Sequence, residues 1–431
     1  MSSPPENSLQ LPVMDIHQPL LPSTDLSSLA EACKEWGFFH IANHGISEEF
    51  YRKLRSLSHQ VFSLPTDAKL RAGPLSPIRA YTPHFIASPF FESLRVSGPD
   101  YYSSAKGSAD VLFDQQETNT EFCRMFLEYG TRMAELSARI VRVLLSCLGD
   151  DVEKKYYEAE FRRCHGYLRV NSYSPPGDVQ EEEEGVEGLG MHTDMSCITI
   201  LYQDEIGGLQ VRSREGGWVD IQPCEGTLVV NIGDLLQAWS NGQLRSSQHR
   251  VVLRQPVSRF SLAFFWCFED DKVVEAPEEV VGKGSRKLYR PFVCLDYVRF
   301  RETIEKGRFE KVGYTVDDFA AALQDSEGRE LSIANGGVEE QRESKISDQT
   351  TASGLRKSRR CTALTAGSME SVAEKSESGV KKISACDVEA LKRCLDEHKG
   401  DYKKCQTEVE AFKLSCSFKK PSPSQDHLKG S

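Results

Sequence analysis

Apolar residues follow two different spacings along positions 11–321. In the first half they recur every three or four residues, and this period predicts helices over 26–36, 48–62 and 118–148. A further helix is expected to begin near Tyr297, with Phe300 and Ile304 on one side. The first half is therefore expected to be mainly helical.

The second half contains short runs of β-branched and aromatic residues. Turn residues such as Gly207-Gly208, Gly216-Gly217 and Asn241-Gly242 separate these runs. The runs predict strands over 168–173, 197–202, 208–211, 218–221, 227–231, 248–253 and 260–268. Strands this short and closely spaced indicate an antiparallel sandwich or barrel, and with the helices they make the fold class α+β.

The chain changes character after this body. Residues 324–382 are rich in Ser, Glu, Lys, Gly and Arg and have almost no aromatic residues. Such a segment cannot bury enough apolar surface to offset the entropy of ordering it, so a disordered linker is expected. Residues 383–418 follow with a short helical pattern that contains four cysteines, which predicts a small α-hairpin.

Composition narrows the possible partners and compartments. The 431 residues include 53 Lys and Arg against 64 Asp and Glu, a formal charge of −11, which argues against nucleic-acid and anionic-membrane binding. No apolar run approaches the ~20 residues of a spanning helix. The first 33 residues contain no Lys or Arg, unlike a secretory or mitochondrial leader. We therefore expect a cytoplasmic protein, with the nucleus left open.

The pair His192 and Asp194 is the first candidate site. It stands at the mouth of the predicted strand 197–202, and in an extended segment both side chains lie on one face. His249 begins another predicted strand. Two imidazoles and one carboxylate leave three coordination positions open, as in non-haem Fe(II) oxygenases. A lone His-x-Asp is more often a solvent-facing histidine beside a turn aspartate. The residues around the motif therefore decide between a metal site and this structural interpretation.

Arg259 and Ser261 favour the metal site. They share a face at the start of the last predicted strand, and the run 262–266 that follows has a fully buried pattern. A buried arginine needs an anion, and a guanidinium beside a hydroxyl suits a carboxylate. A surface arginine on an edge strand is the alternative. The combination predicts a dicarboxylate cosubstrate that chelates iron at one end and contacts Arg259 at the other.

These motifs together resemble a known family. The stretch Gly-Leu-Gly-Met-His-Thr-Asp at 188–194 is similar to the iron-site strand of plant-type 2-oxoglutarate- and Fe(II)-dependent dioxygenases, the group that includes isopenicillin N synthase. The same similarity extends to 199–204, 207–211, 231–242 and 247–251, and to Trp-Gly-Phe-Phe at 36–39 and Asn-His-Gly-Ile at 43–46 in the N-terminal module. It covers roughly residues 11 to 320.

The resemblance implies a fold and a set of site residues. The expected fold is a double-stranded β-helix (jelly-roll) core with flanking helices, in an N-terminal module at 11–115 and a catalytic domain at 116–323. Fe(II) would be bound by His192, Asp194 and His249. The cosubstrate 2-oxoglutarate would be bound by Arg259, Ser261 and Tyr173, with Asn171 close by. No catalytic residue beyond the metal site is implied, and ascorbate is the expected reductant.

The implied reaction is hydroxylation of a small molecule by dioxygen, with release of succinate and carbon dioxide. The chain is similar to gibberellin oxidases, particularly the 2-oxidase-like branch, so a gibberellin-like diterpenoid is the expected substrate; flavonoids and alkaloids stay open. Loops over 80–99 are expected to wall the pocket with Tyr81, Phe85, Phe90 and Phe91. A structural role is expected for His44, and core or substrate-wall packing for Trp239. The acidic insert 181–184 is expected to be a solvated loop, with a place at the substrate entrance as the alternative.

The C-terminal cysteines suggest a second functional element. In antiparallel helices Cys394 would lie near Cys405 and Cys386 near Cys416, where two disulfides would stabilise a unit with little core. A reduced hairpin and a four-thiolate zinc site stay open. The hairpin resembles coiled-coil-helix-coiled-coil-helix proteins of the mitochondrial intermembrane space, which implies a protein partner and that compartment as an alternative location. The alternative function is an assembly protein that acts through this hairpin, with the barrel as a scaffold.

Overall fold

The computed structural model describes residues 9–18, 22–72, 80–84, 88–113, 115–149, 151–176, 185–303 and 314–322, together with 393–394 and 407–408. The predicted linker, the acidic insert 181–184 and three of the hairpin cysteines (Cys386, Cys405 and Cys416) lie outside the described residues. The chain divides into one compact unit of residues 1–322 with 385–431 and a second of residues 323–384. The fold described below belongs to residues 9–322 of the first unit.

A large, mixed sheet forms the base of this fold. Its strand order is β1-β2-β10-β7-β12-β5-β4-β3, and every neighbouring pair is antiparallel except β1 with β2. The strands are β1 (Val13–Asp15), β2 (Phe38–Ala42), β3 (Tyr81–Thr82), β4 (Phe91–Ser97), β5 (His165–Tyr173), β7 (Ile198–Gln203), β10 (Thr227–Ile232) and β12 (Arg259–Cys267).

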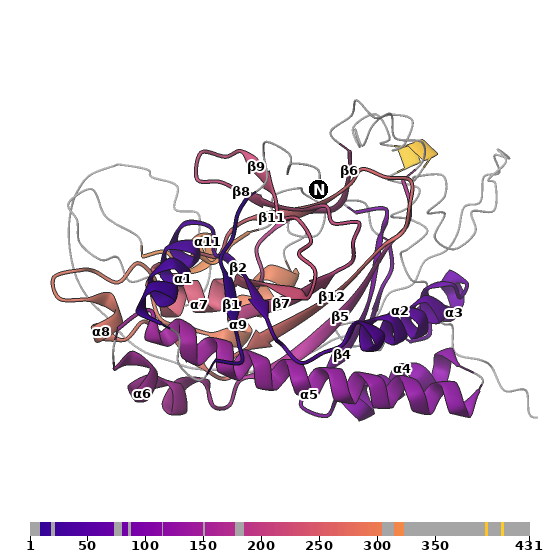
Figure 1. Ribbon diagram of the computed structural model, residues 1–431, viewed down its shortest axis with the longest axis horizontal. Helices are drawn as coiled ribbons and strands as arrows, with labels where there is room; N and C mark the ends of the chain where they lie inside the picture. Colours follow the sequence, from indigo (N-terminus) through magenta and orange to yellow (C-terminus); the bar gives the residue numbers. More distant parts are fainter. Residues whose placement is uncertain are drawn as a thin grey trace, which may run out of the picture. The chain divides into compact units, whose positions relative to one another are not determined.

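A smaller antiparallel sheet faces the large one. It has the order β6-β11-β8-β9, formed by β6 (Val186–His192), β11 (His249–Leu253), β8 (Leu209–Arg212) and β9 (Trp218–Asp220). Figure 1 shows these strands above the large sheet. A separate two-stranded ribbon joins β13 (Val273–Val274) and β14 (Phe292–Val293). The space between the two main sheets is where side chains from both can meet.

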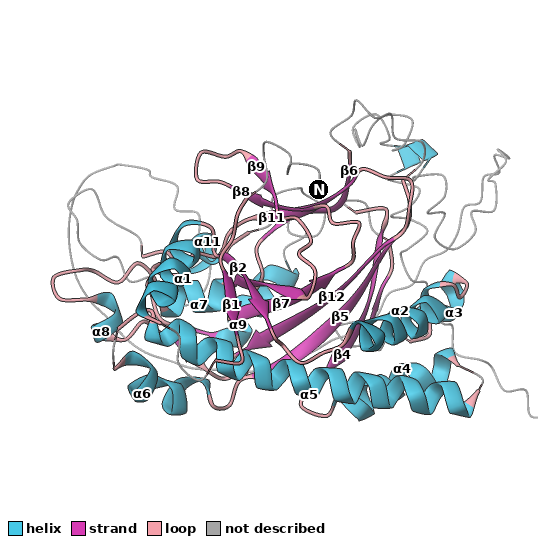
Figure 2. Cartoon of the chain, viewed as in Figure 1, coloured by secondary structure: helices cyan, strands magenta, loops and turns pink. Residues whose placement is uncertain are grey.

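Helices cover the outer face of the large sheet. The longest, α5 (Gln116–Ser146), packs on β5, β7 and β12, and Figure 2 shows it running along that face beside α4 (Tyr101–Leu112). Elsewhere, the described part of the chain also contains α1 (Ser23–Glu35), α2 (Glu48–Phe62), α3 (Thr66–Leu70), α6 (Val152–Tyr156), the π-helix η1 (Tyr157–Phe161), α7 (Asp234–Trp239), α8 (Glu278–Val281), α9 (Cys294–Thr303) and α11 (Val316–Ala320). No helix among the described residues is long and apolar enough to cross a membrane.

The three predicted N-terminal helices are confirmed. Helix α2 has the predicted bounds, because the Ser47 side chain accepts a hydrogen bond from the Phe50 N–H and satisfies the start of the helix. Its buried residues Tyr51, Leu54, Leu57 and Val61 recur at the three- and four-residue spacing that predicted it. The C-terminal helix α9 begins three residues before the predicted Tyr297, at Cys294.

All seven predicted strands are present, but two expectations about their surroundings are wrong. Residues 80–99 are not simply loops, because β3 and β4 pair there and extend the large sheet. His192 does not stand at the mouth of the predicted strand 197–202; it ends a separate strand, β6. The apolar spacing missed β6, since glycine at 188 and 190 is depleted in strands and gives no alternating pattern, whereas the resemblance had already implied an iron-site strand at 188–194.

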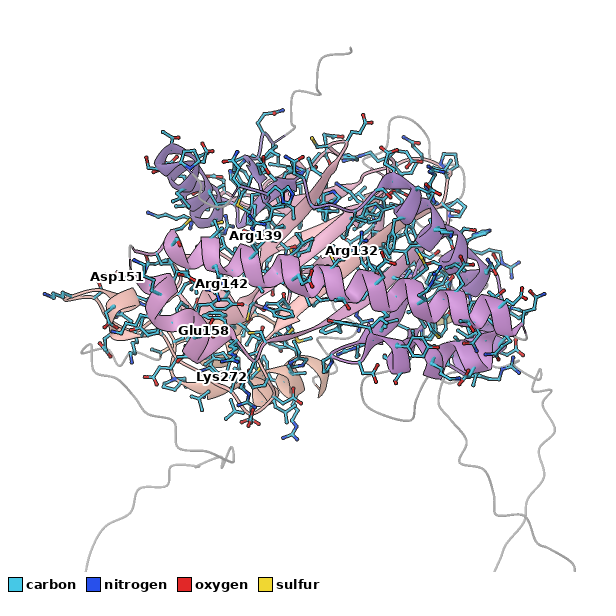
Figure 3. All side chains as sticks on the ribbon, turned by 60° about the horizontal axis from the view of Figure 1, so that its bottom comes forward. Arg132, Arg139, Arg142, Asp151, Glu158 and Lys272 are labelled. Atoms are coloured by element: carbon cyan, nitrogen blue, oxygen red, sulfur yellow. The ribbon has the colours of Figure 1, made fainter. Side chains whose placement is uncertain are left out.

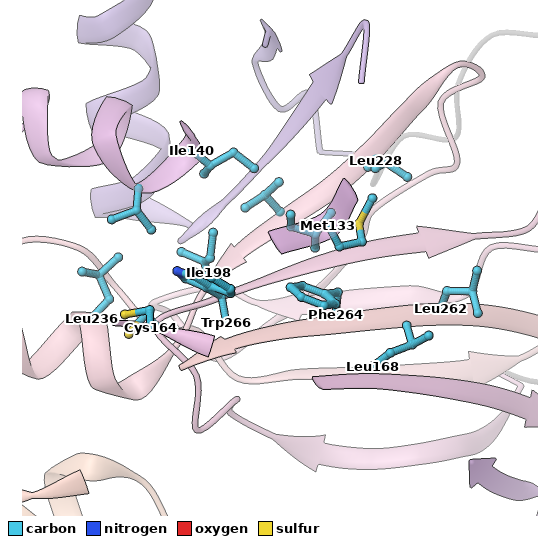
Figure 4. Close-up of a cluster of buried hydrophobic side chains, with 14 of the residues drawn as sticks. Met133, Ile140, Cys164, Leu168, Ile198, Leu228, Leu236, Leu262, Phe264 and Trp266 are labelled. Carbon is cyan, nitrogen blue, oxygen red and sulfur yellow. The ribbon is translucent and has the colours of Figure 1, made fainter. Parts of the chain in front are cut away.

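The main core lies between α5 and the large sheet. Leu168 on β5 and Leu262 and Phe264 on β12 face the helix, where Met133 and Ile140 meet them (Figure 4). All five are fully buried. Since successive residues of a strand point to opposite faces, the residues between them point into the space between the sheets. The residues that alternate with the core residues along β5 and β12 are therefore the ones that can form a site between the sheets.

The outer face of α5 is charged and tied to the segment that follows it. Arg142 donates hydrogen bonds to Glu153 and Glu158, and its guanidinium lies 3.5 Å from the centre of the Tyr157 ring. Lys272 donates in the same region to Glu160 (Figure 3 labels Arg142, Glu158 and Lys272). These contacts hold α6 and η1 against α5, on the side of the molecule away from the small sheet.

Candidate metal centre and cosubstrate pocket

Two histidines and one aspartate meet at the edge of the small sheet. His192 ends β6, His249 begins β11, and the two residues are directly paired across these antiparallel strands. Asp194 lies in the turn after β6. Its Oδ1 atom is 3.7 Å from Nε2 of His192 and 3.7 Å from Nε2 of His249. One ligand atom from each of the three residues falls within 4.8 Å of the others, as a shared metal ion requires.

The two imidazoles are oriented in the same way. Nδ1 of His192 is 2.7 Å from the Gly190 carbonyl, and Nδ1 of His249 is 3.1 Å from the Ser247 carbonyl. A carbonyl can only accept, so each Nδ1 carries the proton and each Nε2 keeps its lone pair. Both lone pairs therefore face Asp194, which is the tautomer that metal binding needs.

Asp194 is held through its other oxygen. Oδ2 accepts hydrogen bonds from Thr199 (2.6 Å) and from the Asn231 side chain (2.8 Å), which leaves Oδ1 for a metal. Burial raises the pKa of Asp194, but His249, His192 and these two hydrogen bonds outweigh it, so the pKa is lowered overall. The carboxylate is therefore ionised at neutral pH, as a metal ligand must be.

Burial has the opposite effect on the histidine. Desolvation, followed by the neighbouring His249, lowers the pKa of His192 to about 4, although the Asp194 carboxylate acts against the shift. His192 is therefore neutral at physiological pH. The donor set of two imidazoles and one carboxylate suits a divalent transition metal and matches the open-sided set of non-haem iron enzymes.

The four predicted cosubstrate residues form two cross-strand pairs. Arg259 on β12 is paired with Tyr173 on β5, and Ser261 is paired with Asn171 two positions along. The guanidinium of Arg259 lies 4.7 Å from the centre of the Tyr173 ring, and its NH1 donates to the Ser261 hydroxyl (3.3 Å). The Asn171 side chain donates to the same hydroxyl (3.2 Å). The structure thus brings together all seven site residues that the sequence singled out.

Arg259 is a buried cation, with 1% of its surface exposed. Its donors reach the Gly207 carbonyl, the Gln203 side-chain oxygen and Ser261, and within the described residues no carboxylate lies at ion-pair distance from it. Nearby, Oδ1 of Asn171 is buried without a hydrogen-bond partner. Asp204 interacts with Arg259 electrostatically but makes no ion pair with it, and an anionic ligand would offset the remaining cost of burying the charge. The Arg259 guanidinium fits a carboxylate, whereas Oδ1 of Asn171 is an acceptor and would need a hydrogen-bond donor.

A cavity of about 300 Å³ connects the metal ligands to Arg259. It lies between the two sheets, because its lining comes from both of them. Near the cosubstrate residues the lining is apolar, from Leu201, Leu209 and Val251. Further along it includes Tyr167, Arg169, Phe265, Thr82 and Met195. Of the aromatic residues expected to wall the pocket, Phe91 lines it, whereas Tyr81 and Phe90 are buried elsewhere and Phe85 lies outside the described residues.

Sequence reasoning missed the residues that hold the ligands. Thr199 and Asn231 are polar positions inside apolar strands, and that contrast is a usable signal. Asp234 and Arg301 hold Thr193, the residue between His192 and Asp194, through hydrogen bonds. Their positions in the sequence do not indicate this role, because both are distant from Thr193 along the chain. His44 and Trp239 have the expected structural roles. The His44 ring accepts from the Ile46 N–H within its turn, and Trp239 packs against Phe161 in the core.

The C-terminal hairpin is described only at a few residues. Cys394 is disulfide-bonded, and every other described cysteine is a free thiol, so its partner lies outside the described residues. The pairings Cys394–Cys405 and Cys386–Cys416 therefore stay predictions.

Comparison with known proteins agrees with the geometry. Residues 164–268 match the 2OG-Fe(II) oxygenase superfamily, and residues 11–90 match the N-terminal region of non-haem dioxygenases in morphine synthesis. A gibberellin 20-oxidase-like protein of Arabidopsis thaliana is 57% identical over 325 residues, which cover 73% of this chain and 98% of the relative. The chain belongs to the 2-oxoglutarate- and Fe(II)-dependent oxygenases.

Other relatives of this chain are named as gibberellin dioxygenases. The Arabidopsis gibberellin 3-beta-dioxygenase 4 is 34% identical, covering 68% of this chain and 81% of the relative, and gibberellin 2-beta-dioxygenase 8 is 31% identical, covering 72% and 86%. The rice dioxygenase for auxin oxidation superimposes with a TM-score of 0.60 at 27% identity, over 73% of this chain and all of the rice chain. JOX2, solved with 2OG, Fe and JA, superimposes with a TM-score of 0.61 at 26% sequence identity. The match covers 75% of this chain and 95% of the JOX2 chain. The expected jelly-roll core with flanking helices is thereby confirmed.

Proposed function

We propose that this dioxygenase oxidises a gibberellin-like diterpenoid and releases succinate and carbon dioxide. The observation that carries the proposal is the position of the cavity between the His192–Asp194–His249 set and Arg259. The cavity can receive a keto-diacid whose two ends need different partners. The gibberellin names of the relatives support the substrate class.

Each side chain of the site has a defined task. His192, Asp194 and His249 would hold Fe(II), and Arg259 with Ser261 would bind the far carboxylate of 2-oxoglutarate, assisted by Tyr173 and Asn171. When bound, the iron and 2-oxoglutarate supply the oxidising chemistry with dioxygen. The Nδ1–H groups of the histidines, fixed on carbonyls, leave Nε2 of each neutral ring as the atom that faces a metal. Leu201, Leu209 and Val251 exclude water around the cosubstrate.

The far part of the cavity suits an amphipathic small molecule. Tyr167 and Phe265 are stacked with ring centres 4.8 Å apart, and Arg95 lies 3.7 Å from the centre of the Tyr167 ring on the large sheet. Arg169 reaches the same wall, with hydrogen bonds to the Thr82 and Ser93 hydroxyls. A largely apolar wall with a few polar groups is typical of sites for hydrophobic ligands.

The test is substrate-stimulated formation of succinate by the purified full chain. The reaction contains Fe(II), ascorbate and 2-oxoglutarate, and gibberellins, auxin and JA are added in separate assays. We expect gibberellins alone to raise succinate formation well above the basal rate, ascorbate to sustain it, and His192→Ala to abolish it. Stimulation by another of these compounds, but not by gibberellins, overturns the substrate class.

The assembly-protein alternative predicts a different result in the same experiment. A scaffold needs neither ligand, so the wild-type chain would bind no divalent metal and no 2-oxoglutarate, and no assay would form succinate. Metal and 2-oxoglutarate binding that depends on His192 and Arg259 excludes this alternative.

A further inference from the structure

The C-terminal helix α9 reaches the metal centre through one side chain. Arg301 lies in its last turn and lines the cavity, with 11% of the side chain exposed. Its NH2 donates to the backbone carbonyl of Thr193 (2.9 Å), the peptide group between His192 and Asp194. Its NH1 lies within 3.1 Å of the Thr193 hydroxyl. Arg301 therefore contacts the residue that separates two of the candidate ligands.

Asp234 completes the contact from the other side. Its Oδ2 accepts hydrogen bonds from Arg301 NH1 (2.7 Å), from the Thr193 hydroxyl (2.8 Å) and from Tyr297 OH. Its backbone N–H donates to the Asp194 carbonyl (2.8 Å). Asp234 is fully buried. The peptide groups on both sides of Asp194 are thus held by one buried ion pair.

The shape of the guanidinium matters here. NH1 of Arg301 donates hydrogen bonds to Asp234, to the Tyr297 hydroxyl and to the Thr193 hydroxyl. NH2 donates to the Thr193 carbonyl. A lysine has a single terminal nitrogen and cannot bond to groups in both directions with the same geometry. The Thr193 backbone determines where the His192 and Asp194 side chains point. Loss of the hydrogen bonds from either nitrogen would therefore allow the distance between these two side chains to vary.

We propose that Arg301 is a positioning residue of the metal centre, which acts through Thr193 to hold His192 and Asp194 at the spacing that one metal ion needs. Helix α9 is then part of the metal site and not only a cover for the barrel. The inference rests on the proposed assignment of the metal to His192, Asp194 and His249. Groups behind metal ligands typically contribute about 10- to 100-fold to metal affinity.

The test compares metal binding by full-length Arg301→Met, Arg301→Lys and wild type, each prepared metal-free. Co(II) serves as the probe, and both its dissociation constant and its visible absorption spectrum are recorded. The matched control is Arg299→Met, which removes the same charge from an exposed position on the same helix. Thermal unfolding of the metal-free proteins shows whether a variant is folded at the titration temperature.

We expect Arg301→Met to weaken Co(II) binding by about 10- to 100-fold and to change the spectrum. Arg301→Lys, which keeps the charge, should also weaken it and should remain folded even if the methionine variant does not. Arg299→Met should stay within twofold of wild type. The inference is overturned if the folded Arg301→Lys binds Co(II) with wild-type affinity and spectrum.

His192→Ala, titrated in parallel, separates the two possible failures. If His192→Ala binds Co(II) as tightly as wild type, the assignment of the metal site is wrong and the inference is overturned with it. If His192→Ala loses binding while both Arg301 variants keep it, only the role of Arg301 is overturned.

Discussion

His192 and His249 face each other across the β6–β11 pair, with ring centres 4.3 Å apart. Two cationic imidazoles at that separation would repel each other in a buried site, so at least one stays neutral. The pairing thus places two ligands side by side and also disfavours a proton on His192. The first two predictions follow from this relationship.

The metal-free protein should lose stability as the pH falls from 6.5 to 4. The pKa of His192 is about 4 in the folded protein and 6.5 as the ordinary value, so within this window the unfolded chain binds a proton that the folded protein does not. His192 contributes at most about 1.4 kcal/mol per pH unit to the slope, and His40 and His44, whose pKa values burial also lowers, add to it. Urea unfolding at several pH values, with the protein kept metal-free by a chelator, measures this change in the free energy of unfolding. The variant His192→Gln is the control and should show a smaller slope. Asp194, whose pKa is lowered from 3.8, contributes only below this window.

Divalent metal should raise the unfolding temperature of the wild-type protein. A ligand present at 100 times its dissociation constant stabilises the folded state by about 2.7 kcal/mol, provided that the unfolded chain does not bind it. Mn(II) in the absence of oxygen is a suitable probe, and excess chelator should reverse the shift. His249→Ala should show little or no shift. An equal shift in both proteins would place the metal elsewhere.

Arg259→Lys should weaken 2-oxoglutarate binding by roughly 10- to 100-fold, since lysine cannot present two parallel donors to a carboxylate. Isothermal titration of the Mn(II)-loaded protein measures the dissociation constant. Tyr173→Phe should have a smaller effect in the same direction. Arg254→Lys, at a partly exposed position paired with Asp220, is the control and should bind as wild type does.

Breaking one buried ion pair between α3 and β4 should strongly destabilise the protein. Lys69 on α3 donates to Glu92 on β4 (2.6 Å), both side chains are 6% exposed, and the Tyr81 hydroxyl donates to the same carboxylate oxygen (2.5 Å). Lys69→Met should cost about 3–5 kcal/mol, because it leaves a buried carboxylate without its cation. Lys69→Met/Glu92→Gln should recover more than half of that loss in urea unfolding. A double variant as unstable as the single one would contradict this account.

Gly233→Ala should damage the metal site through the backbone. A Cβ atom at Gly233 would lie 2.1 Å from the Ser196 carbonyl oxygen, in the turn that carries Asp194, so the turn must move. We expect a loss of about 1–3 kcal/mol in stability and weaker Co(II) binding. The control is Gly107→Ala on the exposed side of α4, where a Cβ meets nothing within 4 Å. That change should stabilise the protein by about 0.5–1 kcal/mol.

The sequence by itself determined the class of the fold and the chemical identity of the site. Period-two alternation placed Arg259 and Ser261 on one face of a strand, and three- and four-residue spacing placed α2 with its observed bounds. Such patterns are local, because the geometry of one strand or one helix turn decides which neighbours share a face. The residue types then limited the ligand to a divalent metal and a carboxylate.

Only the tertiary structure decided which distant residues cooperate. Tyr173 and Arg259 become opposed through the register of β5 and β12, and Arg301 contacts Thr193 only because α9 folds back over the barrel mouth. Strand order and helix docking depend on burial summed over the whole core, which a window of a few residues does not contain. The ligands were therefore visible in the sequence, whereas the groups that orient them were not.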